Sequence, residues 1–196
     1  ILIRTSNRPE CFKKCIDSIL QQNYQNYQVY ICYDKKESLD YLNEYQHYPQ
    51  ICFFYVEETS TEKYKFNLYC NQLLEKVEDG YIMFLDDDDI LIGNRTLEII
   101  NWHLAMNKMI IWNFLRPDKL VFPKDLNKEL ILGEIDTSSI CFHHSLKELS
   151  QWGDKQYGDY HFYKRIFNQC MKKQYVNYIL TTTQFNNKIG NYGENS

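Results

Sequence analysis

The 196-residue sequence lacks three features that would each point to a particular class of protein. No apolar run approaches the roughly 20 residues of a membrane-spanning helix, and no signal peptide precedes the first strand pattern. No basic block stands out in a chain whose net charge is −4, which argues against nucleic acid as a partner. The sequence begins without methionine, so we expect a trimmed start. We also expect the domain to be part of a longer, multidomain chain.

The cysteines also lack the spacing of a metal site. Seven are present, an odd number, and none forms a Cys-x-x-Cys pair. Several fall inside apolar strand or helix patterns. We therefore expect buried, reduced thiols in a cytoplasmic protein rather than disulfides or a zinc site.

What the sequence does have is an apolar run that ends in acids, Tyr81-Ile82-Met83-Phe84-Leu85-Asp86-Asp87-Asp88-Asp89-Ile90. The near-continuous hydrophobicity predicts a strand buried on both faces, as in a parallel sheet. If the segment stays extended, side chains alternate, so Asp86 and Asp88 point one way and Asp87 and Asp89 the other. Two carboxylates on one side at a strand end can share Mg²⁺ or Mn²⁺ together with phosphate oxygens.

Two other kinds of acidic site do not fit the residues of this segment. An EF-hand loop starting at Asp87 would place Leu91 and Ile92 where an oxygen ligand and the turn glycine belong. A phosphatase-type Asp-x-Asp-x-Thr site would need threonine at position 90, which is Ile90. A solvated acidic turn and a metal–diphosphate site stay open on the aspartates alone.

The rest of the chain predicts an α/β fold. Strand patterns at 1–5, 27–34, 51–56 and 81–85 alternate with helix patterns at 9–20, 36–45 and 66–77, which is typical of an open, mostly parallel sheet flanked by helices. Beyond it we expect helices at 94–105, 145–149 and 159–171, and strands at 109–115, 138–142 and 175–182. We expect one domain over 1–196, with a nucleotide-binding half (1–93), an acceptor-side half (94–182) and a loose tail (183–196).

Several stretches resemble one enzyme family. Residues 1–10 (ILIRTSNRPE) are similar to the opening strand and Asn-Arg-Pro turn of family 2-like glycosyltransferases of the GT-A fold, and residues 15–24 to the helix end that follows. Residues 62–67, 80–89, 142–149 and 157–166 resemble later segments of that family in the same order. The Tyr- and Asn-rich style is also similar to amino-terminal glycosyltransferase domains of capsid-glycosylating proteins of large algal DNA viruses. The resemblance implies a Rossmann-like GT-A sheet and sugar transfer from a nucleotide donor.

The resemblance also implies roles on the donor side. Asp88 is the expected direct ligand of Mn²⁺ or Mg²⁺. Asp86 is expected to reach the metal through water or to hold the ribose, and Asp87 to contact the nucleotide-sugar. Asp34, after the second strand, is expected to accept from uracil or ribose, or else to be an ordinary strand-terminating acid. The remaining donor contacts are expected from Thr5, Arg8 and Lys65, where a solvated side chain is the alternative for Arg8, and Lys63 competes with Lys65.

On the acceptor side, Asp159 takes the position of the family's general base, and as the first residue of a helix pattern it is also a candidate helix cap. Two positions differ from the family, because Asp34 is followed by two lysines and Gly158 stands where an acid usually precedes Asp159. The expected function is metal-dependent hexosyl or deoxyhexosyl transfer from a UDP-sugar to a glycan or glycoprotein hydroxyl. The alternatives are a sugar nucleotidyltransferase, which would need a glycine-rich loop after the first strand, and a non-catalytic binding domain of the same fold.

Overall fold

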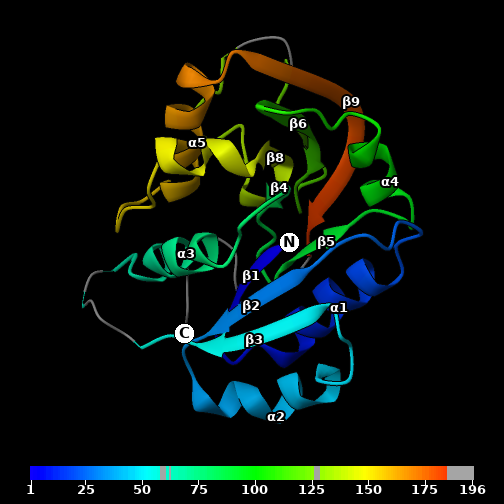
Figure 1. Cartoon of the computed structure of the whole chain (residues 1–196), viewed down its shortest axis with the longest axis vertical. Helices are drawn as coiled ribbons and strands as arrows, with labels where there is room; N and C mark the ends of the chain where they lie inside the picture. The colour runs from blue at the N-terminus through cyan, green and yellow to red at the C-terminus, as the bar shows by residue number, and fades with distance from the viewer. Residues whose placement is uncertain (58–60, 62, 126–128, 185–196) are drawn as a thin grey trace.

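The computed structural model describes residues 1–57, 61, 63–125 and 129–184, and in its first half strands alternate with helices (Figure 1). The elements are β1 (Leu2–Thr5), α1 (Pro9–Leu20), β2 (Val29–Tyr33), α2 (Leu39–Leu42), β3 (Ile51–Tyr55), α3 (Phe66–Glu75) and β4 (Tyr81–Met83). Strands β1, β2 and β3 pair in parallel, in that order. The predicted α/β class is confirmed.

The second half contributes β5 (Asp89–Leu91), α4 (Thr96–Asn101), β6 (Lys108–Leu115), β7 (Val121–Phe122), β8 (Ile140–His143), α5 (Gly158–Gln169) and β9 (Lys172–Thr183). These strands and β4 form a sheet in the order β4-β8-β6-β9-β5, with β7 beside β6. Only β6 and β9 pair in parallel there, so this half of the molecule is mainly antiparallel. The two sheets meet where Leu85 N donates to Leu2 O at 2.9 Å, just after β4.

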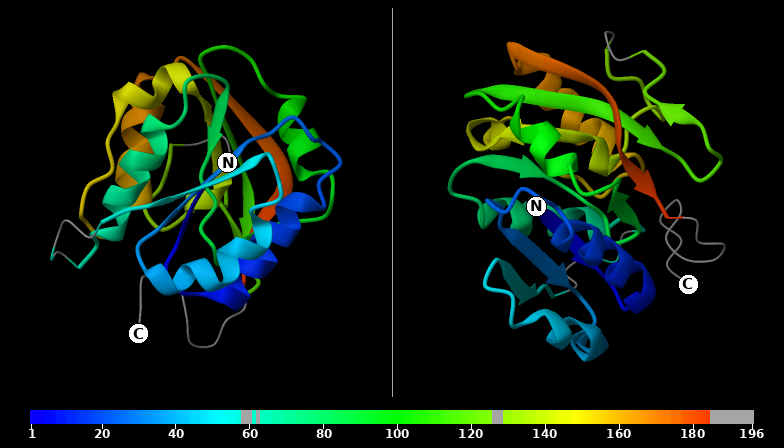
Figure 2. Two further views of the ribbon diagram at one scale, coloured as in Figure 1. Left: turned by 60° about the horizontal axis from the view of Figure 1, so that its bottom comes forward. Right: turned by 90° about the vertical axis from the view of Figure 1, so that its right-hand side faces the viewer.

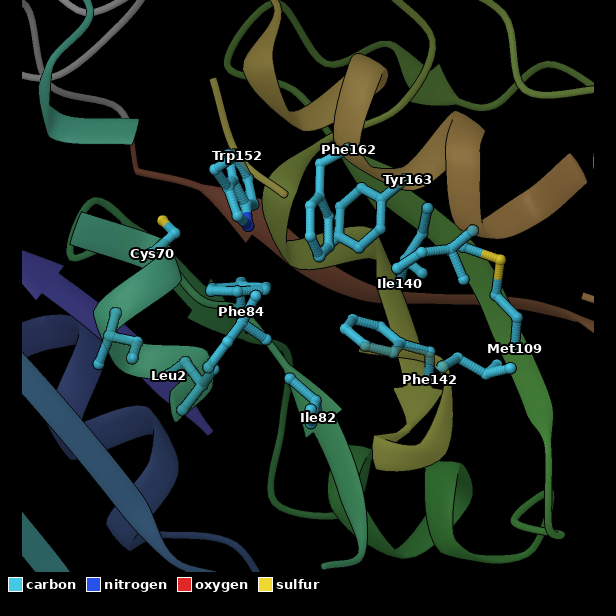
Figure 3. Close-up of a cluster of buried hydrophobic side chains, with 14 of the residues drawn as sticks. Leu2, Cys70, Ile82, Phe84, Met109, Ile140, Phe142, Trp152, Phe162 and Tyr163 are labelled. Carbon is cyan, nitrogen blue, oxygen red and sulfur yellow. The ribbon is translucent and has the colours of Figure 1, made fainter. Parts of the chain in front are cut away.

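Because side chains alternate along the strands, successive residues enter two different hydrophobic cores, one on each face of the sheets. Leu2 and Phe84 lie in a core covered by α3 and α5, shown with its aromatic centre in Figure 3. Ile3 and Leu85, one residue on, lie in a second core covered by α1, α2 and α4. The right-hand view of Figure 2 shows the blue and cyan strands of the first sheet below the green and orange strands of the second. Since helices cover both faces, ligands have access mainly at the strand ends.

Some predictions need correction. The helix expected at 36–45 is only one turn of α-helix between 3₁₀ turns. Residues 89–91 form the strand β5, although Asp89 was expected to belong to a polar strand end. The tail was expected to be loose from 183, yet Thr183 pairs with Asp89, and buried Gln184 donates to the carbonyls of Cys11 (2.9 Å) and Asp87 (3.2 Å). The rest of the tail, 185–196, and Glu62 lie outside the described residues.

Six of the seven cysteines are buried, as expected, and Cys52 is exposed. Within the described parts of the chain, no helix combines the length and the hydropathy needed to cross a membrane.

Candidate active site

The acidic segment folds back on itself instead of staying extended. Asp89 N donates to Asp86 O at 2.8 Å, which closes a tight turn between β4 and β5. The turn brings carboxylate oxygens of Asp86, Asp88 and Asp89 within 4.8 Å of one another. The expected alternation is therefore wrong at Asp89, which joins the Asp86 side, while Asp87 points away. We call Asp86, Asp88 and Asp89 the acidic triad.

Asp87 has a different environment from its neighbours. It is fully buried, accepts a hydrogen bond from Thr5 Oγ1 at 2.6 Å, and is paired with the Arg8 guanidinium. The hydroxyl of Thr5 also shares a 2.8 Å contact with Tyr41. The structure thus joins three residues expected at the nucleotide-sugar, Thr5, Arg8 and Asp87, to one another. Thr5 and Arg8 still border the cavity described below.

Asp86 is held by an arginine that sequence reasoning missed. Arg4 donates to both carboxylate oxygens of Asp86, from Nε at 2.7 Å and Nη2 at 2.9 Å. Its guanidinium also lies 4.9 Å from the ring centre of Phe66. Burial alone would raise the pKa of Asp86, but the charge and hydrogen bonds of Arg4 outweigh it and lower that pKa. Asp86 is therefore ionised at neutral pH.

Asp88 and Asp89 are buried carboxyls whose pKa values are raised. Burial, with Asp86 and Asp136 nearby, raises the pKa of Asp88 to about 7, although Arg8 opposes this from 3.7 Å. Burial and the charge of Asp136 raise the pKa of Asp89 well above its ordinary range. Burial also raises the pKa of Asp136, and hydrogen bonds with Ser138 and Asp89 oppose that rise. A bound cation would favour the ionised form of these carboxyls and relieve the repulsion between them.

A second residue that sequence reasoning missed is Asp136, which caps the 3₁₀ turn Thr137–Ser139. Its Oδ1 accepts from Ser138 N (2.9 Å) and Ser138 Oγ (2.6 Å). The preceding segment has no strand or helix period, and the cap pattern alone predicts a turn, so nothing in the sequence links Asp136 to the triad.

An all-oxygen set of carboxylates suits Mg²⁺ or Mn²⁺ better than zinc or copper.

These groups border a cavity of about 490 Å³ at the carboxyl ends of the strands. The donor half contributes Arg4, Thr5, Arg8, Asp34, the acidic triad and an aromatic wall from the start of α3, and the second half contributes Asp136, Trp152 and Asp159. Asp34 brings one carboxylate oxygen 3.4 Å from the hydroxyl of Tyr69, and its other oxygen is buried without a hydrogen-bond partner in the described structure. Asp34 thus presents an acceptor that a ligand N–H or hydroxyl can use. Lys65 is half-buried at the start of α3 and does not line the cavity.

Asp159 belongs to the acceptor-side half of the chain and lies in the first turn of α5. It faces the cavity and is half-buried. Burial and the charge of Asp136 raise its pKa to about 7, while a hydrogen bond from its neighbour Tyr160 N–H opposes the rise. The helix-cap position itself is Tyr157, in the left-handed region at φ 57°. Asp159 therefore combines a first-turn position with a pKa suited to a general base.

The departure at Gly158 has a steric reason. A β-carbon there would lie 2.5 Å from Nδ2 of Asn67, a buried side chain on α3. A larger residue, acidic or not, would displace Asn67. His143 and His144 do not line this cavity: His143 contacts Ser145, and His144 lies near the carbonyl of Gly80.

The chain is similar to known proteins in both sequence and fold. Residues 1–172 match the sequence profile described as "Glycosyl transferase family 2". The fold is similar to S. aureus TarS 1-349 (TM-score 0.74, 14% identity, 93% of this chain and 59% of that one). It is also similar to the same protein in complex with UDP-GlcNAc (0.68, 12%, 98% and 59%). A third similar structure is the mannosyltransferase PcManGT from Pyrobaculum calidifontis in complex with GDP-Man and Mn²⁺ (0.68, 16%, 97% and 57%). The chain thus spans under two thirds of each of these proteins.

Proposed function

The chain belongs to glycosyl transferase family 2, and on that premise we propose that it moves a sugar from a UDP-linked donor to an acceptor hydroxyl with Mn²⁺ or Mg²⁺. The observation that carries the proposal is the acidic triad, whose carboxylate oxygens lie within 4.8 Å of one another, with Asp136 raising the pKa values of Asp88 and Asp89 from beside it. The metal would supply positive charge where the leaving diphosphate becomes more negative.

On the donor side, Asp88 is the proposed direct ligand and Asp86 the ligand through water or the ribose contact. Arg4 keeps Asp86 ionised and fixes its plane through two hydrogen bonds. Arg8 holds Asp87 and the turn, and its remaining contact is with Asp88 at 3.7 Å. We propose that Asp87, Thr5 and Arg8 position the ligands, and that Asp34 accepts from uracil or ribose with its unpartnered oxygen.

On the acceptor side, the proposed base is Asp159. The acceptor oxygen bonds to the anomeric carbon, the bond from that carbon to the phosphate oxygen breaks, and the acceptor proton passes to the carboxylate. A pKa of about 7 leaves a useful fraction ionised at neutral pH and makes the conjugate base stronger than an ordinary aspartate. Attack from the face opposite the leaving group would invert the anomeric centre.

The finer assignments rest on the sequence resemblance. We propose a glycan or glycoprotein acceptor, with hexosyl or deoxyhexosyl transfer, in a cytoplasmic setting that fits the burial of six of the seven cysteines. The likeness to viral capsid-glycosylating domains makes a capsid glycan one acceptor to assay. Lys65 remains a proposed base or phosphate contact.

The test is titration calorimetry of UDP with Mn²⁺, with Mg²⁺ and with a chelator. We expect UDP to bind at least about tenfold more tightly with either metal, and equal affinity in all three conditions would overturn the metal–diphosphate assignment. Screening UDP- and GDP-sugars for hydrolysis and transfer then separates an enzyme from a non-catalytic binding domain. A domain that binds donor and never cleaves it would refute the proposed activity.

A further inference from the structure

Two asparagines on α3 hold the backbone of the segment that leads into α5. Asn71 makes a reciprocal pair with Trp152: its Nδ2 donates to Trp152 O at 3.0 Å, and its Oδ1 accepts from Trp152 N at 2.8 Å. Asn67 lies one helical turn earlier, on the same face, and its Nδ2 donates to Lys155 O at 3.0 Å and Gly153 O at 3.3 Å. All these contacts go to main-chain atoms, so they depend on the path of the segment and not on its side chains.

Asn67 connects the same segment to the donor half. Its Oδ1 accepts from Arg4 Nη1 at 2.9 Å, and the other two nitrogens of that guanidinium hold Asp86. Its amide also packs against Gly158 so closely that a β-carbon does not fit between them. One buried side chain therefore touches the arginine that fixes Asp86 and the residue immediately before Asp159.

We propose that Asn67 and Asn71 are positioning residues that set where Asp159 stands relative to the acidic triad. The inference rests on the proposed function, in which Asp159 is the base. The segment 152–158 leads into α5. It is fixed to the donor half by the hydrogen bonds from α3 and by the packing of the Trp152 ring on Phe84. Positioning of this kind is energetically significant, because an error of about 1 Å between reacting groups costs on the order of a hundredfold in rate.

Asn71 is the better site for a test, because it does not line the cavity and Asn67 does. Asn71→Ala removes both hydrogen bonds to Trp152 and leaves Arg4 and its pairing with Asp86 unaltered. Gln72→Ala, at the next position of the same helix, is the matched control for helix propensity and for loss of a polar side chain.

The first measurement is amide hydrogen exchange, which needs no activity. We expect Asn71→Ala to raise exchange of Trp152 N–H and the amides of 153–159 by about tenfold, since each such bond contributes about 1 kcal/mol, while Gln72→Ala leaves them as in the wild type. Unchanged protection of this segment in Asn71→Ala would refute the attachment, whatever the enzyme does.

The second measurement is a double-mutant cycle on turnover. Asn71→Ala should lower kcat by about ten- to a hundredfold and leave the UDP dissociation constant within about twofold. In an Asp159→Asn background the same change should have little further effect, since the group being positioned is gone. Equal losses in both backgrounds would overturn the positioning role and leave the proposed function intact. Wild-type turnover by Asp159→Asn alone would instead overturn the proposed function, and the positioning role with it.

Discussion

Removing a charge from the acidic triad should stabilise the metal-free protein and abolish its response to metal. Asp88 is the residue for this test because its pKa rises from an ordinary 3.8 to about 7 in the folded chain. A carboxyl whose pKa is higher when folded binds protons more tightly in the folded state. The free energy of unfolding therefore falls as the pH rises from the unfolded pKa through the folded one.

The size of the effect follows from that difference. Keeping Asp88 ionised above pH 7 costs the folded state roughly 4 kcal/mol at most, at 1.36 kcal/mol per pH unit. Since the pKa values of neighbouring Asp89 and Asp136 are raised as well, these acids compete with Asp88 for protons, and about half of this is a reasonable expectation. A gain of ~2 kcal/mol raises the melting temperature of a domain of this size by about 4–8 °C.

The assay is thermal unfolding of wild type and Asp88→Asn at about pH 5 and pH 8, each with chelator and with Mn²⁺. With chelator at the higher pH, we expect Asp88→Asn to melt above the wild type. At the lower pH the difference should shrink to roughly a third, because pH 5 has passed the unfolded pKa of 3.8 but lies well below the folded pKa of about 7. With Mn²⁺, only the wild type should gain stability. If Asp88→Asn melts below the wild type at the higher pH without metal, the carboxylate is a structural partner, and the reasoning from repulsion is wrong.

Three further outcomes follow from the cavity. Asp159→Asn should bind UDP as the wild type does and turn over about two to four orders of magnitude more slowly. Because the pKa of Asp159 is about 7, the kcat of the wild type should rise with pH through that value. A flat pH profile would contradict the assignment of Asp159 as the base. Asp34→Ala should weaken UDP binding and reduce discrimination against GDP, as measured by competition; GDP competing as well as UDP in the wild type would contradict the uridine preference. Gly158→Ala forces Asn67 to move and should destabilise the fold by about 1–3 kcal/mol in denaturant titration, whereas an unchanged midpoint would show that Asn67 yields freely.

The positions of the strand ends could be predicted from the sequence, whereas the contacts between residues at different strand ends could not. Continuous apolar runs locate β1, β2 and β4, so the placement of Asp34 and the aspartates at one edge of the sheet follows from parallel pairing. The turn at Asp86 does not follow, because its shape depends on Asp87 finding Arg8 and Thr5 inside the fold.

Contacts between distant parts of the chain explain the other omissions. Arg4 sits inside an apolar strand pattern, where an arginine looks like an outward-facing residue until Asp86 is placed beside it, 82 positions away. Asp136 reads as a turn cap and becomes a site residue only when β8 and β9 bring its turn against Asp89. Local periodicity carries no information on either pairing.

The distribution of thiols gives the protein a ready attachment point for a probe. Cys52, on the edge strand β3, is exposed, while the other six sulfhydryls are buried. A maleimide dye added to the native protein should therefore modify one position, without any prior removal of cysteines. Since Cys52 does not line the cavity, such a conjugate would allow donor binding to be followed by fluorescence on the unaltered sequence.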